Sequence, residues 1–132
     1  MMTLKIKLRT TVRSIAIAAA LLAAPALGMA HGPKVGANGG VMADAGDYHV
    51  EVLPDGTTLQ VFLRDHSDKD VASAGFKGTA ILVVGGKPQR IPLTPAGANK
   101  LSGTSSVALP KEPKGAVQIT TPTGSTVQAK FP

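Results

Sequence analysis

The chain contains no cysteine and no tryptophan, and its aromatic residues are limited to one tyrosine and three phenylalanines. The lack of cysteine excludes disulfides, thiolate metal ligands, a cysteine nucleophile and a lipid attached to an N-terminal cysteine. The fold must therefore be held together by a packed core or by a metal. The scarcity of aromatic side chains also leaves almost nothing that could stack against nucleic-acid bases.

Long apolar runs are absent except near the start of the chain. There, Pro25 ends an apolar run over residues 15–24, and the small residues Gly28 and Ala30 follow it, after a positive segment with Lys5, Lys7, Arg9 and Arg13. This layout predicts a signal-peptide helix over residues 1–30, cleaved after Ala30, and a periplasmic product. The run is about half of the ~20 residues that span a bilayer, so no stable membrane span is expected after cleavage. A cut at Ala24-Pro25-Ala26 and an uncleaved signal anchor are the alternatives.

The basic character of the chain comes largely from this leader. The whole sequence has 14 basic and 8 acidic residues, but four of the basic ones lie before residue 31, so the mature chain has a net charge of +2. Its charges are scattered along the sequence without a basic stripe, which argues against nucleic-acid binding. The remaining 102 residues are enough for one small domain.

The mature chain reads as β-structure. Residues 31–46 are Gly-rich and predicted to be irregular, and residues 47–132 are predicted to form a β-sandwich domain. Alternating apolar residues over 48–53 and 59–63 flank an Asp55-Gly56 turn signal. Five further strands are predicted over residues 80–84, 87–93, 100–107, 116–120 and 126–131. Prolines within the second of these five favour an edge position for it. About seven short strands at this spacing predict an all-β, immunoglobulin-like antiparallel sandwich.

No catalytic motif emerges from the sequence. A G-x-S-x-G elbow, a phosphate-binding loop and a dinucleotide fingerprint are all absent. Asp65, His66 and Ser67 are adjacent in sequence, which does not by itself form a triad. The protein is therefore predicted not to be an enzyme.

Three histidines are the strongest metal ligands in the mature chain. Cleavage after Ala30 would make His31 the first residue, whose amine and imidazole together can chelate Cu(II) or another divalent metal such as Zn or Co. His49 and His66 would supply further nitrogens, and Asp65 would assist the site directly or accept a hydrogen bond from a ligand. The alternatives are an unstructured tail for His31 and solvent-exposed positions for the other two.

The register of the first hairpin tests whether two of these histidines can share one site. A turn centred between Asp55 and Gly56 pairs His49 with Phe62 and His66 with Ala45. His49 and His66 would then lie about 13 Å apart along the ladder. This register predicts that a shared site needs a bulge, a shift of pairing or a bent loop.

The order of short motifs resembles a group of small periplasmic heavy-metal-resistance proteins and the N-terminal modules of cobalt–zinc–cadmium and copper efflux adaptor subunits. The resemblance rests on His31-Gly32-Pro33, Gly39-Gly40, the segments over 48–52 and 65–69, and Leu93-Thr94-Pro95-Ala96-Gly97. It implies an all-β domain that handles metal ions in the periplasm, with His31, His49 and His66 at the family's histidine positions. The expected function is a soluble periplasmic carrier or buffer of copper or another divalent heavy metal, with an efflux component as a partner. The alternative is an adaptor or structural domain that binds another protein without a metal.

Overall fold

The structure is a computed structural model that describes residues 34–132. The predicted signal peptide, its cleavage site and His31 lie outside these residues. The described part contains strands and no helix, so none of it forms a helix able to cross a membrane. The strands are β1 (Lys34–Val35), β2 (Val41–Ala45), β3 (Tyr48–Asp55), β4 (Thr58–Asp65), β5 (Lys77–Val84), β6 (Lys87–Pro95), β7 (Lys100–Thr104), β8 (Lys114–Thr120) and β9 (Thr126–Phe131).

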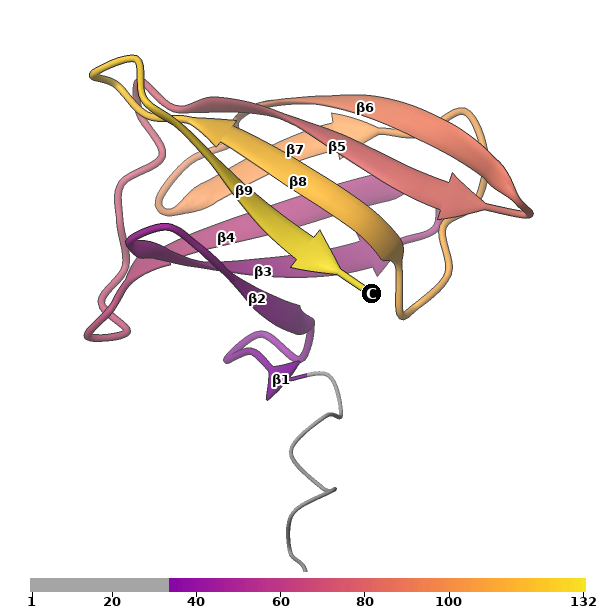
Figure 1. Ribbon diagram of the computed structural model, residues 1–132, viewed down its shortest axis with the longest axis horizontal. Helices are drawn as coiled ribbons and strands as arrows, with labels where there is room; N and C mark the ends of the chain where they lie inside the picture. The colour runs from indigo at the N-terminus through magenta and orange to yellow at the C-terminus, as the bar shows by residue number, and fades with distance from the viewer. Residues whose placement is uncertain (1–33) are drawn as a thin grey trace, which may run out of the picture. The chain divides into compact units, whose positions relative to one another are not determined.

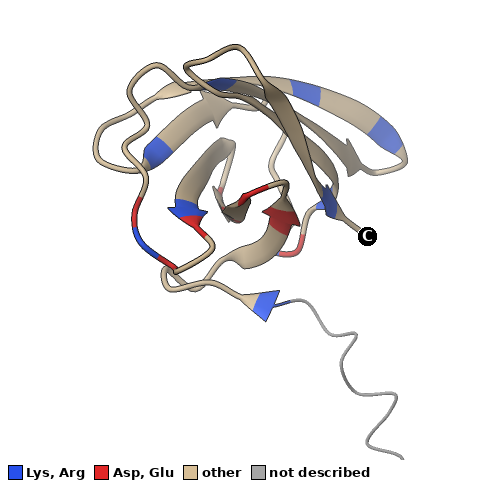
Figure 2. Ribbon diagram, turned by 60° about the vertical axis from the view of Figure 1, so that its left-hand side comes forward, with Lys and Arg blue, Asp and Glu red and all other residues tan. Residues whose placement is uncertain are grey.

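The strands form one antiparallel sheet that curls into a half-barrel, as Figures 1 and 2 show. Their order across the sheet is β1-β2-β3-β4-β7-β6-β5-β8-β9. The curl brings the end of β2 close to β9. A Cβ atom added to Gly46, which follows β2, would lie only 2.8 Å from Cγ1 of Val127 in β9. The interior of this curl holds the core.

Alternation along the strands fills that core. In β3 and β4, Val50, Val52, Val61 and Leu63 point inward and are fully buried, while the residues between them face outward. The same alternation in the later strands buries Ala80, Leu82, Ile91, Leu93, Leu101, Val117, Ile119, Ala129 and Phe131. The all-β prediction is therefore confirmed.

The strand count differs from the predicted seven. All seven predicted strands are present, and β1 and β2 are added within residues 31–46, which the sequence predicted to be irregular. Glycines in this segment masked its strand character, because Gly36, Gly39 and Gly40 belong to the loop between β1 and β2. The loop is held by Glu51 of β3, β2 pairs with β3, and β1 pairs with β2.

The position of β6 also departs from the prediction, since β6 lies inside the sheet between β5 and β7. Its prolines are tolerated for a local reason. Over residues 87–93 β6 pairs with β5 alone, and it pairs with β7 only at Thr94 and Pro95. Pro88 and Pro92 therefore lie where one side of the strand needs no backbone donor.

Candidate functional site

The β3–β4 hairpin decides where two of the candidate histidines lie. Its register pairs Tyr48 with Asp65, His49 with Arg64 and Asp55 with Thr58, so the two-residue turn is Gly56-Thr57. The predicted turn was one residue too early, and the predicted pairing was therefore off by two. β3 continues through Asp55, and Gly56 takes the positive φ of 60° at the first turn position, as in a type II′ turn.

The corrected register brings His49 and His66 together. Their ring centroids are 6.1 Å apart and the rings meet edge to face, at 89°. The predicted separation of about 13 Å along the ladder is therefore wrong. The two imidazoles lie at the end of the sheet where the β2–β3 turn meets the loop that follows β4.

His49 lies on the outer face of β3 between two carboxylates. Its Nδ1 is 2.7 Å from Oδ1 of Asp68, and its Nε2 is 3.5 Å from Oδ1 of Asp44, which pairs with it in β2. A neutral imidazole donates from one nitrogen only, so the short contact with Asp68 favours the tautomer with the proton on Nδ1. The His49 side chain is 20% exposed and is therefore held in place on several sides.

His66 is the more open of the two. Its Nε2 is 3.2 Å from Oδ1 of Asp47, in the turn between β2 and β3, and its side chain is 65% exposed. Little packing opposes rotation of this ring. His49 thus offers a fixed imidazole and His66 an adjustable one.

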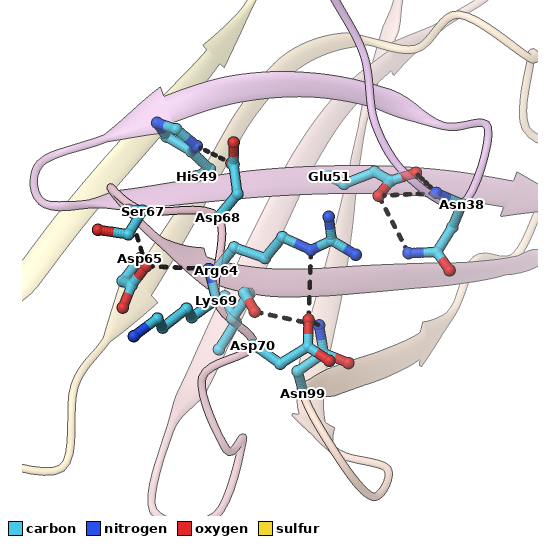
Figure 3. Close-up of polar contacts among 11 residues, drawn as sticks. Asn38, His49, Glu51, Arg64, Asp65, Ser67, Asp68, Lys69, Asp70 and Asn99 are labelled. Carbon is cyan, nitrogen blue, oxygen red and sulfur yellow. Dashed lines mark hydrogen bonds and ion pairs between the residues drawn. The ribbon is translucent and has the colours of Figure 1, made fainter.

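The loop over residues 66–69 supplies Asp68, and Asp65 gives the loop its shape. Oδ1 of Asp65 accepts hydrogen bonds from the backbone N–H groups of Ser67 (2.8 Å) and Lys69 (3.0 Å), as Figure 3 shows. The same donors hold the pKa of the Asp65 carboxyl below its ordinary value, the Lys69 N–H having the largest effect. This oxygen of Asp65 is therefore engaged with the loop backbone, and the carboxylates that contact histidines are those of Asp44, Asp47 and Asp68.

Asp68 adopts a positive φ of 58°, which aspartate tolerates better than most residues. This backbone conformation accompanies the contact between its carboxylate and His49. At the end of β4, Asn99 donates hydrogen bonds to the carbonyl oxygen of Leu63 and to the carboxylate of Asp70. The same Asp70 carboxylate lies 3.3 Å from Arg64 Nε. The N–H of Arg64 is not aligned for a hydrogen bond, so this contact is an ion pair only. The loop is thereby anchored at both of its ends.

Glu51 is a polar residue whose importance the sequence reasoning missed. It lies on the same outer face of β3 as His49 and is only 3% exposed, because the 36–40 loop covers it. Its carboxylate accepts hydrogen bonds from Gly40 N (2.7 Å), Asn38 N (3.0 Å) and Asn38 Nδ2 (3.1 Å). A Cβ atom on Gly36 would lie 2.2 Å from Cδ of Glu51, so the close approach requires glycine. The signal was present in Gly36-x-Asn38-Gly39-Gly40, which lies in the segment that the sequence predicted to be irregular.

The histidine–aspartate cluster consists of His49, His66, Asp44, Asp47 and Asp68. Within residues 34–132, no three His, Asp or Glu side chains converge as they stand on a point where one metal ion would bind. The ring nitrogens instead contact carboxylates. The cluster concentrates two imidazoles and three carboxylates at one end of the sheet, and this is chemistry suited to cations and protons.

No family model, curated protein or solved structure matched this chain in the three comparisons made.

Proposed function

We propose that this protein is a soluble periplasmic metal-binding protein, a carrier or buffer of Cu(II) or another divalent heavy metal linked to resistance or efflux. The observation that carries the proposal is the 6.1 Å separation of the His49 and His66 rings among three carboxylates. Imidazole nitrogens with carboxylate oxygens are a ligand set that Cu(II), Zn(II) and Co(II) accept. Membership of the immunoglobulin-like class and the resemblance to heavy-metal-resistance proteins stay predictions.

Each residue of the cluster has a distinct part in the proposed site. Asp68 holds the proton on Nδ1 of His49 and leaves Nε2 as the ligand, facing Asp44. His66 would turn its exposed ring from Asp47 toward the same ion. His31, which lies outside the described residues, would add its amine and imidazole after cleavage. Asp65 was predicted to assist the site directly or to accept a hydrogen bond from a ligand; in the proposed site it would instead act indirectly, by shaping the loop that carries Asp68.

Calorimetric titration of the processed protein with Cu(II), Zn(II) and Co(II) tests the proposal. We expect one ion per chain, and we expect His49→Gln or His66→Gln to weaken binding about tenfold or more, because losing a ligand costs at least as much as losing a group that only orients one. Asp55→Asn is the matched control, because this exposed carboxylate lies at the opposite end of β3 and should leave the affinity unchanged. An affinity no tighter than that of an unstructured histidine peptide would overturn the proposal.

The part played by His31 is tested separately. The intact mass of the exported protein fixes the first residue, and a cut after Ala30 predicts a chain beginning at His31. Acetylation of the His31 amine should then weaken Cu(II) binding sharply, because it removes the amine from the chelate that it forms with the imidazole of the same residue. An unchanged affinity would remove the amine from the site and leave the His49–His66 pair.

A further inference from the structure

The outer face of the β6-β5-β8-β9 part of the sheet carries cations around an apolar centre. Alternation places every second residue of these strands outside, since Ala80, Leu82, Val117 and Ile119 between them are buried. We call this surface the basic face, and its outward residues are Lys77, Thr79, Ile81, Val83, Pro88, Arg90, Pro92, Lys114, Ala116, Gln118, Thr120, Thr126, Gln128 and Lys130.

Strand pairing gives this face an ordered arrangement. One row across four strands runs Arg90, Ile81, Ala116, Lys130, with a cation at each end and two apolar side chains between. In the next row, Val83 is 46% exposed and pairs with Pro88 on one side and Lys114 on the other. The face therefore combines apolar area for contact with charge at its margins, as protein-binding surfaces do.

The two signs of charge are also divided unevenly between the first and second parts of the described chain. Residues 34–70 carry three basic and seven acidic residues, whereas residues 71–132 carry seven basic residues and one acidic residue. The strands of the basic face contain no Asp or Glu among their described residues. Figure 2 shows the Lys and Arg positions along these strands and the acidic ones gathered around β3, β4 and the loop that follows. The small net charge of the mature chain does not reveal this separation of acidic from basic residues.

A polar groove opens on the same face between β5 and β8. Its volume is about 270 Å³, and Lys77, Gly78, Thr79, Gln118 and Thr120 line it. An ammonium, two hydroxyls and an amide side chain in one groove offer donors to a carboxylate. The groove is therefore a place where one acidic side chain of a partner would fit.

We propose that the basic face docks an acidic surface of another protein, with a partner carboxylate in the groove beside Lys77. Charge complementarity favours this occupant over others. A membrane surface would be met by aromatic side chains at the interface, and this face has none. A single-stranded nucleic acid would likewise need aromatic side chains to stack on its bases. Docking here uses none of the residues of the proposed metal site, so either proposal can fail without the other.

The test uses metal-free processed protein, labelled with ¹⁵N, and a glutamate-rich peptide as the probe. We expect shifts of the backbone amides of Lys77, Thr79, Ile81 and Gln118 that saturate and weaken with salt. Arg90→Glu with Lys130→Glu should weaken peptide binding about fivefold or more. Lys34→Glu with Lys111→Glu is the matched control, since it makes the same change of charge at exposed positions outside the face.

A second variant distinguishes binding in the groove from non-specific electrostatic attraction between the protein and the peptide. Thr79→Leu leaves the charge unchanged and fills part of the groove, so it should weaken peptide binding about threefold. Three results would overturn the proposal. They are equal losses in the two charge-reversal variants, tighter binding to anionic lipid vesicles or a DNA oligonucleotide than to the peptide, and self-association that Arg90→Glu with Lys130→Glu abolishes.

Discussion

A carboxylate that is almost wholly buried needs donors for its oxygens, and Glu51 receives them from the backbone and side chain of the 36–40 loop. Hydrogen bonds to a charged group are stronger than neutral ones, and leaving such a group without partners is expensive. Gly36 and Gly40 allow the loop to approach this closely. One side chain of β3 thus fixes the whole segment that leads into β2.

Replacing Glu51 with glutamine should destabilise the protein by about 2 kcal/mol, because the amide loses the charge and turns donors toward backbone N–H groups. Denaturant unfolding measures the difference. Glu112→Gln is the control, since Glu112 is exposed and its replacement should change stability by no more than about 0.5 kcal/mol. Equal effects of the two substitutions would show that the loop does not depend on the Glu51 carboxylate.

At the scale of elements, the loop after β4 is organised by one ionised side chain. Asp65 accepts two backbone N–H groups, and the pKa of its carboxyl is lowered from its ordinary value of 3.8, chiefly by the Lys69 N–H. Because the pKa is lower in the folded state, the stabilisation that the ionised Asp65 carboxylate gives to the fold is complete above the ordinary pKa. It is lost only as the pH falls through the lowered pKa.

The amide proton shifts of Ser67 and Lys69 should therefore share a transition whose midpoint lies below 3.8. An NMR pH titration measures them. In Asp65→Asn the two amides should show no such transition. A shared transition well above the ordinary value would mean that the loop does not stabilise the ionised carboxylate.

The strands show how much the sequence could predict and why the rest escaped it. β3 to β9 follow from alternating apolar residues and turn signals, since each needs only local information. β1 and β2 could not be predicted in this way, because the segment that contains them is held by contacts with a residue distant in sequence. That residue is Glu51, which is buried beneath Asn38 and its neighbouring glycines. The alternation predicted over residues 48–53 is present in β3, where Val50 and Val52 are buried and His49 lies on the outer face.

The position of the β3–β4 turn could not be predicted from local sequence. Asp55-Gly56 and Gly56-Thr57 are both acceptable turns locally, and only the pairing of whole strands selects between them. A turn moved by one residue shifts the pairing by two, which changes the distance between His49 and His66 and hence the chemistry of the site. The residue types of the site were predictable, but their proximity was not.

At the scale of the whole molecule, the curled sheet separates two kinds of surface. One part carries the histidines with Asp44, Asp47 and Asp68, and another carries Lys77, Arg90, Lys114 and Lys130 over four strands without a carboxylate. In the two proposals made above, the first surface would bind the metal ion and the second would bind a partner protein.

The most direct test of the proposed metal site is a Zn(II) titration followed by the ring resonances of His49 and His66. The account predicts that both rings shift together, in one transition that is complete at one ion per chain, because their centroids lie 6.1 Å apart. Shifts of only one ring, or separate transitions for the two, would contradict it.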